Sequence, residues 1–300
     1  MRKAWILALL PMLAAAPAPA EGPGTLDKIR SMGAITLGVR DASIPFSFLD
    51  DQQNAVGYSV DLCMKVADAV KKELKMPALE VKRQVVTSAS RIPLMANGTI
   101  DIECGSTVNN AERQRIVAFS FTTFLVNTKF IVKKSSGIRT LQDLKGRAVS
   151  VTAGTNTLQK ILAINQQMNL GMTVIQGKDH PESFMFLETG RTAAFSEDDI
   201  LLAGLAANSK APGDYMLVGI DGMDADPYAL MIRRDDPAFR KLVDDTLAAY
   251  FASGQLEATY EKWFMKAIPP RGIVLEFPPS AQWKKTIAHP TDSPDPKDYR

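Results

Sequence analysis

The chain has 300 residues, of which 46% are hydrophobic and 23% charged, which is enough to bury one large core or two ordinary ones. The mean hydropathy of −0.06 excludes a protein with many membrane spans, and 35 basic against 33 acidic residues leave no basic excess for nucleic-acid binding. Two cysteines and two histidines are too few for a disulfide scaffold or a His-based metal centre, so we expect neither a metal nor a cofactor.

The first 20 residues have the pattern of a secretory signal peptide. Arg2 and Lys3 precede a short apolar run at 5–13, and Ala18 and Ala20 form a small-residue cleavage site. Pro11 interrupts the run, which is shorter than the ~20 residues that span a membrane. Cleavage after Ala20 removes two basic residues and leaves a mature chain with no net charge. We therefore expect an exported, periplasmic protein.

The mature chain alternates predicted strands and helices. Short apolar runs rich in Val and Ile predict strands at 34–39, 81–86, 99–104, 129–132, 148–152, 172–175, 193–195, 215–218 and 228–232. Amphipathic spacing predicts helices at 61–74, 237–251 and 255–264, and the segment after 277 is expected to be loop with at most one short helix. This order predicts an α/β fold with mostly parallel sheets covered by helices, in two domains.

Polar residues follow many of the predicted strands, where ligands bind in open α/β sheets. The residues at such positions are Arg40, Ser88, Arg91, Ser106, Thr155, Asn156, His180 and Asp198. Arg113 comes shortly after the loop that contains Ser106. Taken singly, each has an ordinary explanation: an arginine is usually solvated, and a serine or threonine usually caps a helix. Taken together, they favour a cleft lined from both halves of the chain.

The charges of these residues indicate a class of ligand. Arg40, Arg91 and Arg113 supply three cations and Asp198 one anion, and the helix that begins near Asn156 adds positive potential. A buried charge needs a partner, so the complementary ligand has two carboxylates and one ammonium. That description fits an acidic amino acid.

Several segments resemble the periplasmic glutamate/aspartate-binding proteins of bacterial ABC importers, which are solute-binding proteins of family 3. They are 38–48 (GVRDASIPFSF), 87–94 (TSASRIPL), 97–106 (NGTIDIECGS), 109–114 (NNAERQ), 195–199 (FSEDD) and 201–204 (LLAG). The resemblance implies a two-lobed periplasmic-binding-protein fold (type II) with a two-crossover hinge. Lobe 1 would comprise 25–125 plus 226–280 and lobe 2 would comprise 126–225. The tail 281–300 would pack on lobe 1 or be disordered.

The resemblance also implies a role for each site residue. Arg40, Ser88, Arg91 and His180 would hold the side-chain carboxylate of the ligand. Arg113, with backbone N–H groups near Val108 and Asn156, would hold the α-carboxylate. Asp198, with the carbonyl of Ser106, would hold the ammonium. Thr155 completes the expected ligand-binding set.

Two positions depart from the pattern of the family. Val108 stands where relatives have a threonine, which removes one hydroxyl acceptor expected near the ammonium. Asn156 stands where relatives often have threonine, so a side-chain contact differs while a backbone contact is kept. The residues expected at the dicarboxylate end are unaffected.

Cys63 and Cys104 are expected to be two buried free thiols. Pairing is the alternative, since the compartment is oxidising, and it requires Cα atoms within about 7 Å.

The leading function is a monomeric, non-enzymatic binding protein that captures L-glutamate or L-aspartate, with glutamine and asparagine as further candidates, and delivers it to the permease subunits of an ABC importer in the inner membrane. One alternative is a periplasmic dehydratase of a prephenate-like dicarboxylate on the same scaffold, against which Asp198 argues because it would face ligand carboxylates. Another is a sensor that presents its ligand to a membrane receptor.

Overall fold

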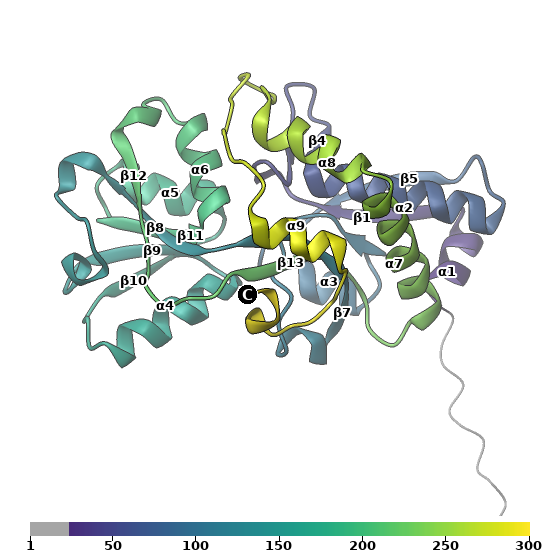
Figure 1. Cartoon of the computed structure of the whole chain (residues 1–300), viewed down its shortest axis with the longest axis horizontal. Coiled ribbons are helices and arrows are strands. Elements are labelled where there is room, and N and C mark those ends of the chain that lie inside the picture. Colours follow the sequence, from purple (N-terminus) through teal and green to yellow (C-terminus); the bar gives the residue numbers. More distant parts are fainter. Residues whose placement is uncertain (1–23) are drawn as a thin grey trace, which may run out of the picture.

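The computed structural model describes residues 24–300, and Figure 1 shows two halves side by side. The leader expected at 1–20 lies outside the described residues. Each half is built on its own sheet, and we call the half with the earlier strands the first lobe and the other the second lobe. In residues 24–300, no helix combines the length and apolar character that a membrane crossing requires.

The sheet of the first lobe has five strands in the order β5-β1-β6-β13-β7. Its strands are β1 (Ala34–Val39), β5 (Glu80–Val85), β6 (Ile102–Glu103), β7 (Val117–Val126) and β13 (Asp226–Arg233). Pairing is parallel from β5 to β6 and antiparallel where β13 meets β6 and β7. Directly after β1 in the chain, a small three-stranded sheet is formed by β2 (Ala42–Ser43), β3 (Ser47–Leu49) and β4 (Ala55–Val56).

The sheet of the second lobe has the order β10-β9-β11-β8-β12. Its strands are β8 (Thr128–Lys133), β9 (Ala148–Thr152), β10 (Thr173–Gly177), β11 (Ala194–Asp198) and β12 (Tyr215–Val218). Again one side is parallel, from β10 to β11, and the pairings of β8 are antiparallel. The expected α/β fold with parallel pairing is present, and the antiparallel strands flank the segments where the chain passes from one lobe to the other.

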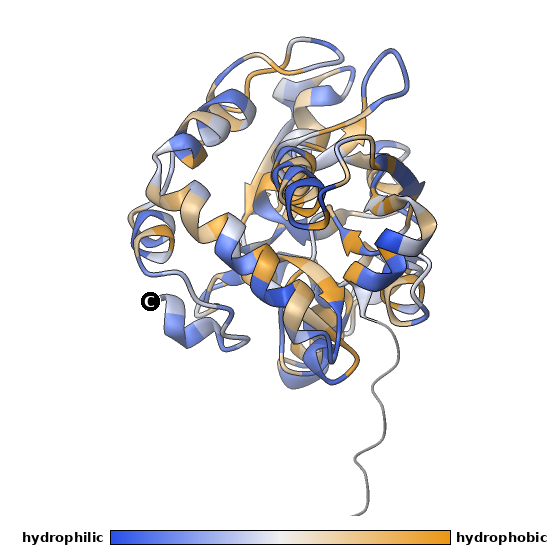
Figure 2. Cartoon of the chain, turned by 90° about the vertical axis from the view of Figure 1, so that its right-hand side faces the viewer, coloured by the Kyte–Doolittle hydropathy of each residue, from blue (hydrophilic) through white to orange (hydrophobic). Residues whose placement is uncertain are grey.

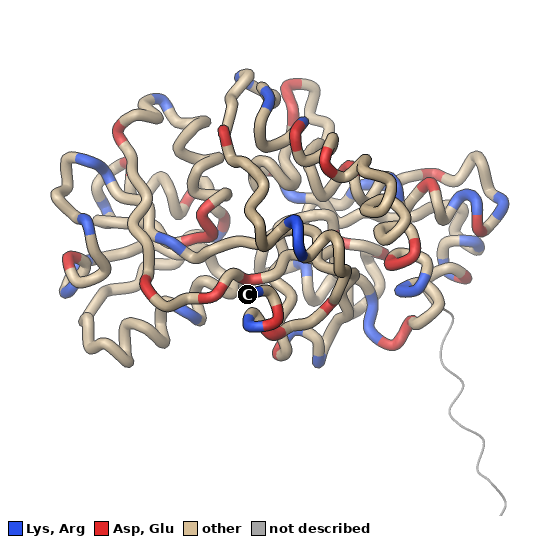
Figure 3. Tube along the Cα trace, in the orientation of Figure 1, with Lys and Arg blue, Asp and Glu red and all other residues tan. Residues whose placement is uncertain are grey.

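Helices cover both sheets (Figure 1). The first lobe carries α1 (Thr25–Met32), α2 (Tyr58–Leu74), α3 (Arg91–Ala96), α7 (Pro237–Ala252), α8 (Gln255–Tyr260) and α9 (Ala281–Ala288). The second lobe carries α4 (Asn156–Gln167), α5 (His180–Glu188) and α6 (Asp199–Asn208). Figure 2 shows hydrophobic colour on the strands inside the molecule, and Figure 3 shows both signs of charge spread over both lobes.

Alternation along β8 assigns the helices of the second lobe to opposite faces. Phe130 and Val132 share a hydrophobic cluster with α4, whereas Ile131 shares one with residues of α5 and α6. Side chains alternate between the two faces of a strand, so the sheet is covered on both sides. Between these two layers the central strand β11 is buried along its whole length, and its carboxyl end is Asp198.

An aromatic cluster anchors the first lobe next to the passage between lobes. The rings of Phe124 and Phe264 stack at 4.8 Å, and Phe46 and Tyr58 meet Phe124 edge-on. The turn before α2 needs a glycine, because Gly57 has φ +141° and a Cβ there would lie 2.2 Å from the carbonyl oxygen of Phe46. The end of β7 is thereby fixed to the first lobe before the chain enters β8.

The chain passes between the lobes twice, from β7 to β8 and from β12 to β13. The C-terminal segment lies against both passages. The indole of Trp283 in α9 donates to the carbonyl of Thr123 at 3.0 Å, and Tyr299 clusters with Leu125 and Ala225. Arg300 forms a bidentate ion pair with Asp224, with both contacts at 2.8 Å.

Cys63 and Cys104 form a disulfide, so the expectation of two free thiols is wrong. Cys63 lies on the buried face of α2 and Cys104 follows β6, and their Cα atoms are 6.0 Å apart. This separation falls within the range that a disulfide needs. It arises from the packing of α2 against the sheet, which spacing along the chain does not reveal.

Candidate functional site

The predicted site residues meet where the two lobes face each other. Arg40 follows β1, Ser106 follows β6, His180 is the first residue of α5, and Asp198 ends β11. Arg91 begins α3 and Arg113 begins a short 3₁₀ turn. All of the predicted residues are buried except Asn156, which is partly exposed. Both sheets thus contribute loops to one site at the ends of their strands, as expected for open α/β sheets.

Three buried guanidinium groups make one side of the site positive. Arg91 donates to the carbonyl of Ser106 at 3.0 Å, and Arg113 donates to the carbonyl of Val108 at 2.8 Å. Burial, followed by the charge of Arg91, lowers the pKa of Arg40 and that of Arg113 to about 10 each. The guanidiniums remain charged at neutral pH, and a carboxylate is the group that best relieves their burial.

Unpartnered polar atoms concentrate at this site. Among the described residues, most of the buried side-chain atoms that make no hydrogen bond belong to it: Nε and Nη1 of Arg40, Oγ of Ser88, Nε of Arg91, Oε1 of Glu103, Oγ of Ser106, Nε2 of His180 and Oε2 of Glu197. Buried polar groups are normally hydrogen-bonded, and exceptions mark functional positions. Most of these atoms can donate, which suits a ligand rich in acceptor oxygens.

Asp198 provides a negative centre on the second lobe. Its Oδ2 accepts a short hydrogen bond from the hydroxyl of Tyr228, and its Oδ1 accepts from Thr128 at 3.4 Å. Burial and the charges of Glu197 and Asp226 raise the pKa of Asp198 well above its usual value. A ligand ammonium placed beside this carboxylate would restore its ionised form, because an opposite charge favours ionisation.

Three predicted residues use their side chains elsewhere. The hydroxyl of Thr155 caps α4 by accepting from the backbone N–H of Leu158 at 3.2 Å. The side chain of Asn156 accepts from Asn110 of the first lobe at 3.0 Å. Val108 is 3% exposed and belongs to the hydrophobic cluster of the first lobe. Because these two side chains are engaged elsewhere, only the backbone groups of Thr155 and Asn156, at the start of α4, are available to contact a ligand.

The structure adds buried acidic residues that sequence reasoning missed. Glu103 lies 3.9 Å from Arg91 and accepts from Thr107 at 2.6 Å. Glu197 lies 3.4 Å from Nδ1 of His180 and accepts from Thr157 at 3.0 Å. In the sequence, Glu197 is an ordinary member of an acidic turn. A signal was present for Glu103, which lies within the apolar run 99–104 that the sequence predicts to be a strand and ends the observed β6.

The lobes touch each other around the site. Besides the contact between Asn110 and Asn156, Arg113 donates to the carbonyl of Gly154 at 3.3 Å. Lys160 on α4 forms a close ion pair with Asp226 on β13. A cavity of about 180 Å³ remains between the lobes at the start of α4, with Arg113 and Asn156 in its lining. The contacts between the lobes show that they are closed on each other, and of the predicted ligand-binding residues only Arg113, Thr155 and Asn156 line this cavity.

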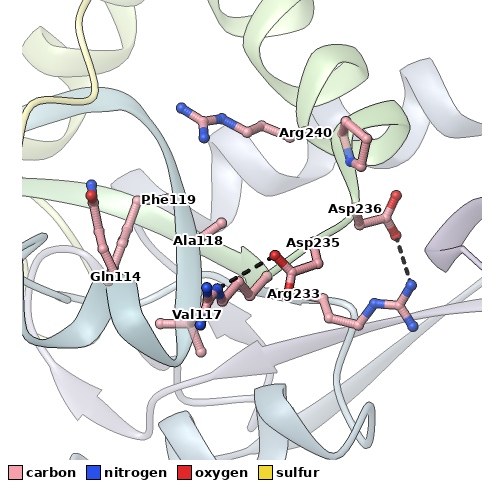
Figure 4. Close-up of a pocket in the computed structure, with 10 residues that line it drawn as sticks. Gln114, Val117, Ala118, Phe119, Arg233, Asp235, Asp236 and Arg240 are labelled. Carbon is pink, nitrogen blue, oxygen red and sulfur yellow. Dashed lines mark hydrogen bonds and ion pairs between the residues drawn. The ribbon is translucent and has the colours of Figure 1, made fainter. Parts of the chain in front are cut away.

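A larger cavity, of about 470 Å³, lies on the first lobe at the end of β13 and the start of α7 (Figure 4). Two pairs of charged side chains in its lining lie close together, Arg233 with Asp236 and Arg234 with Asp235, each at 3.4 Å, and Arg240 lies 3.5 Å from Asp244 outside the lining. Asp236 also caps α7 by accepting from Phe239. These groups stabilise the fold locally, so the space between the lobes is the better candidate for a ligand site.

Comparison with known proteins agrees with this geometry. Residues 35–266 match the sequence model of a protein family, the bacterial extracellular solute-binding proteins, family 3. The chain is 49% identical to the L-glutamate/L-aspartate-binding protein of Pseudomonas aeruginosa, over 95% of each chain. It is 46% identical to the glutamate/aspartate import solute-binding protein of Salmonella typhimurium, over 92% of this chain and 90% of the relative.

A solved structure supports the fold. The crystal structure of a mutant of ArgBP from T. maritima superposes with a TM-score of 0.70 at 25% identity, covering 80% of this chain and 98% of that one. The match over most of the chain, together with the two lobes and the buried site between them, leads to one conclusion. The chain belongs to the bacterial extracellular solute-binding proteins, family 3.

Proposed function

We propose that this protein captures L-glutamate or L-aspartate between its lobes in the periplasm and delivers it to the permease subunits of an ABC importer. The observation that carries the proposal is the set of three buried arginines with unpartnered donors on one side of the site and Asp198 on the other. The names of the relatives support the same ligand class. The proposal contains no chemical step, and a prephenate-like substrate would leave Asp198 without a cation.

Each end of the ligand has proposed contacts. Arg40, Ser88, Arg91 and His180 hold the side-chain carboxylate, because their unpartnered donors lie on buried side chains. Arg113, with backbone N–H groups near Val108 and Asn156, holds the α-carboxylate. The carboxylate of Asp198 and the carbonyl of Ser106 hold the ammonium.

Capture requires that the lobes open and close. We take 25–125 plus 226–280 as one rigid unit and 126–225 as the other, because their strands belong to separate sheets. The contacts of Arg113 with Gly154 and of Lys160 with Asp226 then form only when the lobes meet. Hinge closure around a ligand is the established motion of periplasmic binding proteins.

Export completes the proposal. Signal peptidase would cleave after Ala20, and the mature chain would begin at Glu21. Intact-mass measurement of periplasmic protein tests this directly, and retention of residues 1–20 would contradict it.

Calorimetric titration with glutamate, aspartate, glutamine, asparagine and glutarate tests the ligand assignment. We expect the two acids to bind most tightly and glutarate, which lacks the ammonium, to bind weakly. At ligand 100-fold above Kd, the gain in stability is about 2.7 kcal/mol. The proposal is wrong if neither acid binds while the protein is folded.

A further inference from the structure

His180 and Glu197 form a buried pair beside the arginines. Nδ1 of His180 lies 3.0 Å from Oγ1 of Thr152 and 3.4 Å from Oε2 of Glu197. Both residues are 2% exposed. The opposite ring nitrogen, Nε2 of His180, has no hydrogen-bond partner, and Oε2 of Glu197 has no neighbour of this kind other than Nδ1 of His180. The imidazole therefore has one side towards a carboxylate and the other side available to a ligand.

When every group is ionised, as Asp198 is beside a ligand ammonium, the charges of the site residues balance. Within residues 24–300, the guanidiniums of the site face an equal number of carboxylates; the set is Arg40, Arg91, Arg113, Glu103, Glu197 and Asp198. The neighbouring Asp226 is paired with Lys160. An acidic amino acid brings two carboxylates and one ammonium, so its entry would leave one net negative charge buried. A buried net charge is costly, and uptake of one proton removes it.

His180 is the group through which a proton can distinguish an acid from an amide. A neutral imidazole with its proton on Nδ1 offers a lone pair at Nε2, which accepts from the NH₂ group of an amide. A protonated imidazole donates from both nitrogens, to Glu197 on one side and to a ligand carboxylate on the other. If a ligand carboxylate faced an unprotonated Nε2, its oxygen and the nitrogen would be two acceptors in contact, with no hydrogen between them.

We propose that Glu197 is a specificity-determining residue, and that binding of glutamate or aspartate places one proton on the His180–Glu197 pair whereas binding of glutamine or asparagine does not. The preference for acids over amides then depends on pH. This inference rests on the proposed function, because it requires the ligand side chain to lie against Arg40, Arg91 and His180.

The surroundings of the pair give the direction of the effect. Burial, then the charges of Arg40 and Arg91, lowers the pKa of His180 well below its usual value. Burial raises the pKa of Glu197 to about 7, while its hydrogen bonds from Thr157 and from the backbone of Asp198, and the charges of Arg91 and Arg40, act in the opposite direction.

A ligand carboxylate offsets the arginine charges and raises the proton affinity of both members of the pair. Proton uptake is therefore expected at and above about pH 7, the pKa of Glu197 without ligand. The affinity for the acids should fall as pH rises through that range.

The test is isothermal titration calorimetry of glutamate and of glutamine from pH 6.5 to 8.5, in buffers with different ionisation enthalpies. Near pH 8 we expect glutamate to take up close to one proton more than glutamine. The ratio of the Kd for glutamate to the Kd for glutamine should rise by up to about tenfold per pH unit, the slope of a one-proton linkage. The ligand ammonium is common to both, so it cancels from the comparison.

The variant Glu197→Gln separates this role from a structural one. The amide keeps an oxygen for Thr157 and the backbone of Asp198, but it removes one negative charge. We expect this variant to take up no more protons with glutamate than with glutamine, the ratio of the two Kd values to be independent of pH, and glutamate to bind more tightly than it does to wild type at pH 8.5. A structural role predicts equal losses for glutamate and glutamine and an unchanged proton count. Asp244→Asn, which changes a carboxylate on α7 that accepts from Phe121, is the matched control and should leave the proton count unchanged.

The outcomes are distinguishable. If glutamate takes up no more protons than glutamine on binding the wild type, this inference is overturned and the proposed function stands. If neither acid binds at any pH, the proposed function itself fails. The wild-type proton count and the contrast between glutamate and glutamine need no variant, so they decide the matter even if Glu197→Gln does not fold.

Discussion

The hydroxyl of Tyr228 on β13 donates a hydrogen bond to Oδ2 of Asp198 on β11. One residue belongs to the sheet of the first lobe and the other to the sheet of the second, so this bond joins the lobes at the proposed ammonium site. It also orients the carboxylate of Asp198. Among the described residues, the other carboxylate oxygen, Oδ1, accepts a hydrogen bond only from Thr128, at the longer distance of 3.4 Å.

Tyr228→Phe should therefore weaken binding of all amino acids. A hydrogen bond to a charged group is worth about 1.5–3 kcal/mol, which corresponds to about tenfold or more in Kd. Titration calorimetry with glutamate and glutamine should show losses of similar size, because the ammonium is common to both. Tyr250→Phe removes a hydroxyl that contacts Thr259 away from the site and should leave Kd unchanged. A loss confined to glutamate would mean that Tyr228 acts at the other end of the ligand.

The arginines should differ in what they discriminate. Arg113→Ala should abolish binding of every amino acid, because Arg113 is assigned to the α-carboxylate. Arg40→Ala and Arg91→Ala should weaken glutamate and aspartate more than glutamine and asparagine, by about 2–5 kcal/mol for the acids.

The same calorimetric panel checks the three arginine variants. Arg30→Ala, which removes an exposed arginine of α1 paired with Asp27, is the control expected to bind normally. Equal losses across acids and amides for all three site variants would contradict the assignment of the two carboxylates.

The disulfide should contribute to the stability of the first lobe. It joins residues 41 apart in sequence, and removal of such a cross-link typically costs about 2–4 kcal/mol. Chemical denaturation of the double variant Cys63→Ala, Cys104→Ala should show a loss of this size. A thiol reductant should destabilise the wild type to a similar extent and leave the double variant unchanged. Stability that is insensitive to reductant in the wild type would show that the bond adds nothing in solution.

Val108→Thr tests the placement of the ammonium. Val108 pairs with Tyr228 in an isolated β-bridge, so it lies next to the residue that bonds Asp198. Threonine can keep one methyl group in the hydrophobic cluster that holds Val108, while its hydroxyl replaces the other methyl group and offers the ammonium a further acceptor. We expect Val108→Thr to bind glutamate and aspartate about 2- to 10-fold more tightly, since a gain of about 0.5–1.5 kcal/mol remains after a water is displaced. Glutarate binding should not improve. An equal gain for glutarate would place residue 108 away from the ammonium.

The sequence predicts the strands well where they are continuous apolar runs. The run at 34–39 coincides with β1, in which every residue except Thr36 is apolar or glycine and is buried, as expected for a strand covered on both faces. β7 was missed because Ser120, Thr122 and Thr123 interrupt its apolar residues. These side chains are buried because distant segments satisfy them: Ser120 accepts from Leu230 and Thr122 bonds Tyr299.

The sequence predicts the buried arginines of the site, but of its buried acidic residues it predicts only Asp198. An arginine after a buried strand stands out, whereas Glu197 resembles an ordinary surface acid in an acidic turn until the fold buries it. The pairing of Cys63 with Cys104 likewise depends on a distance between α2 and β6. Sequence patterns report local periodicity and composition, and these features depend on contacts between residues far apart in the chain.

The ion pair between Arg300 and Asp224 affects the choice of position for a tag or a label. Asp224 lies in the passage from β12 to β13, so the last residue of the chain rests beside the pivot of the lobes (Figure 1). A purification tag or fluorophore fused after Arg300 would sit on that pivot and could report or impede its bending. A label near Gly24, which lies beside Asp236 on the first lobe, would leave the pivot untouched.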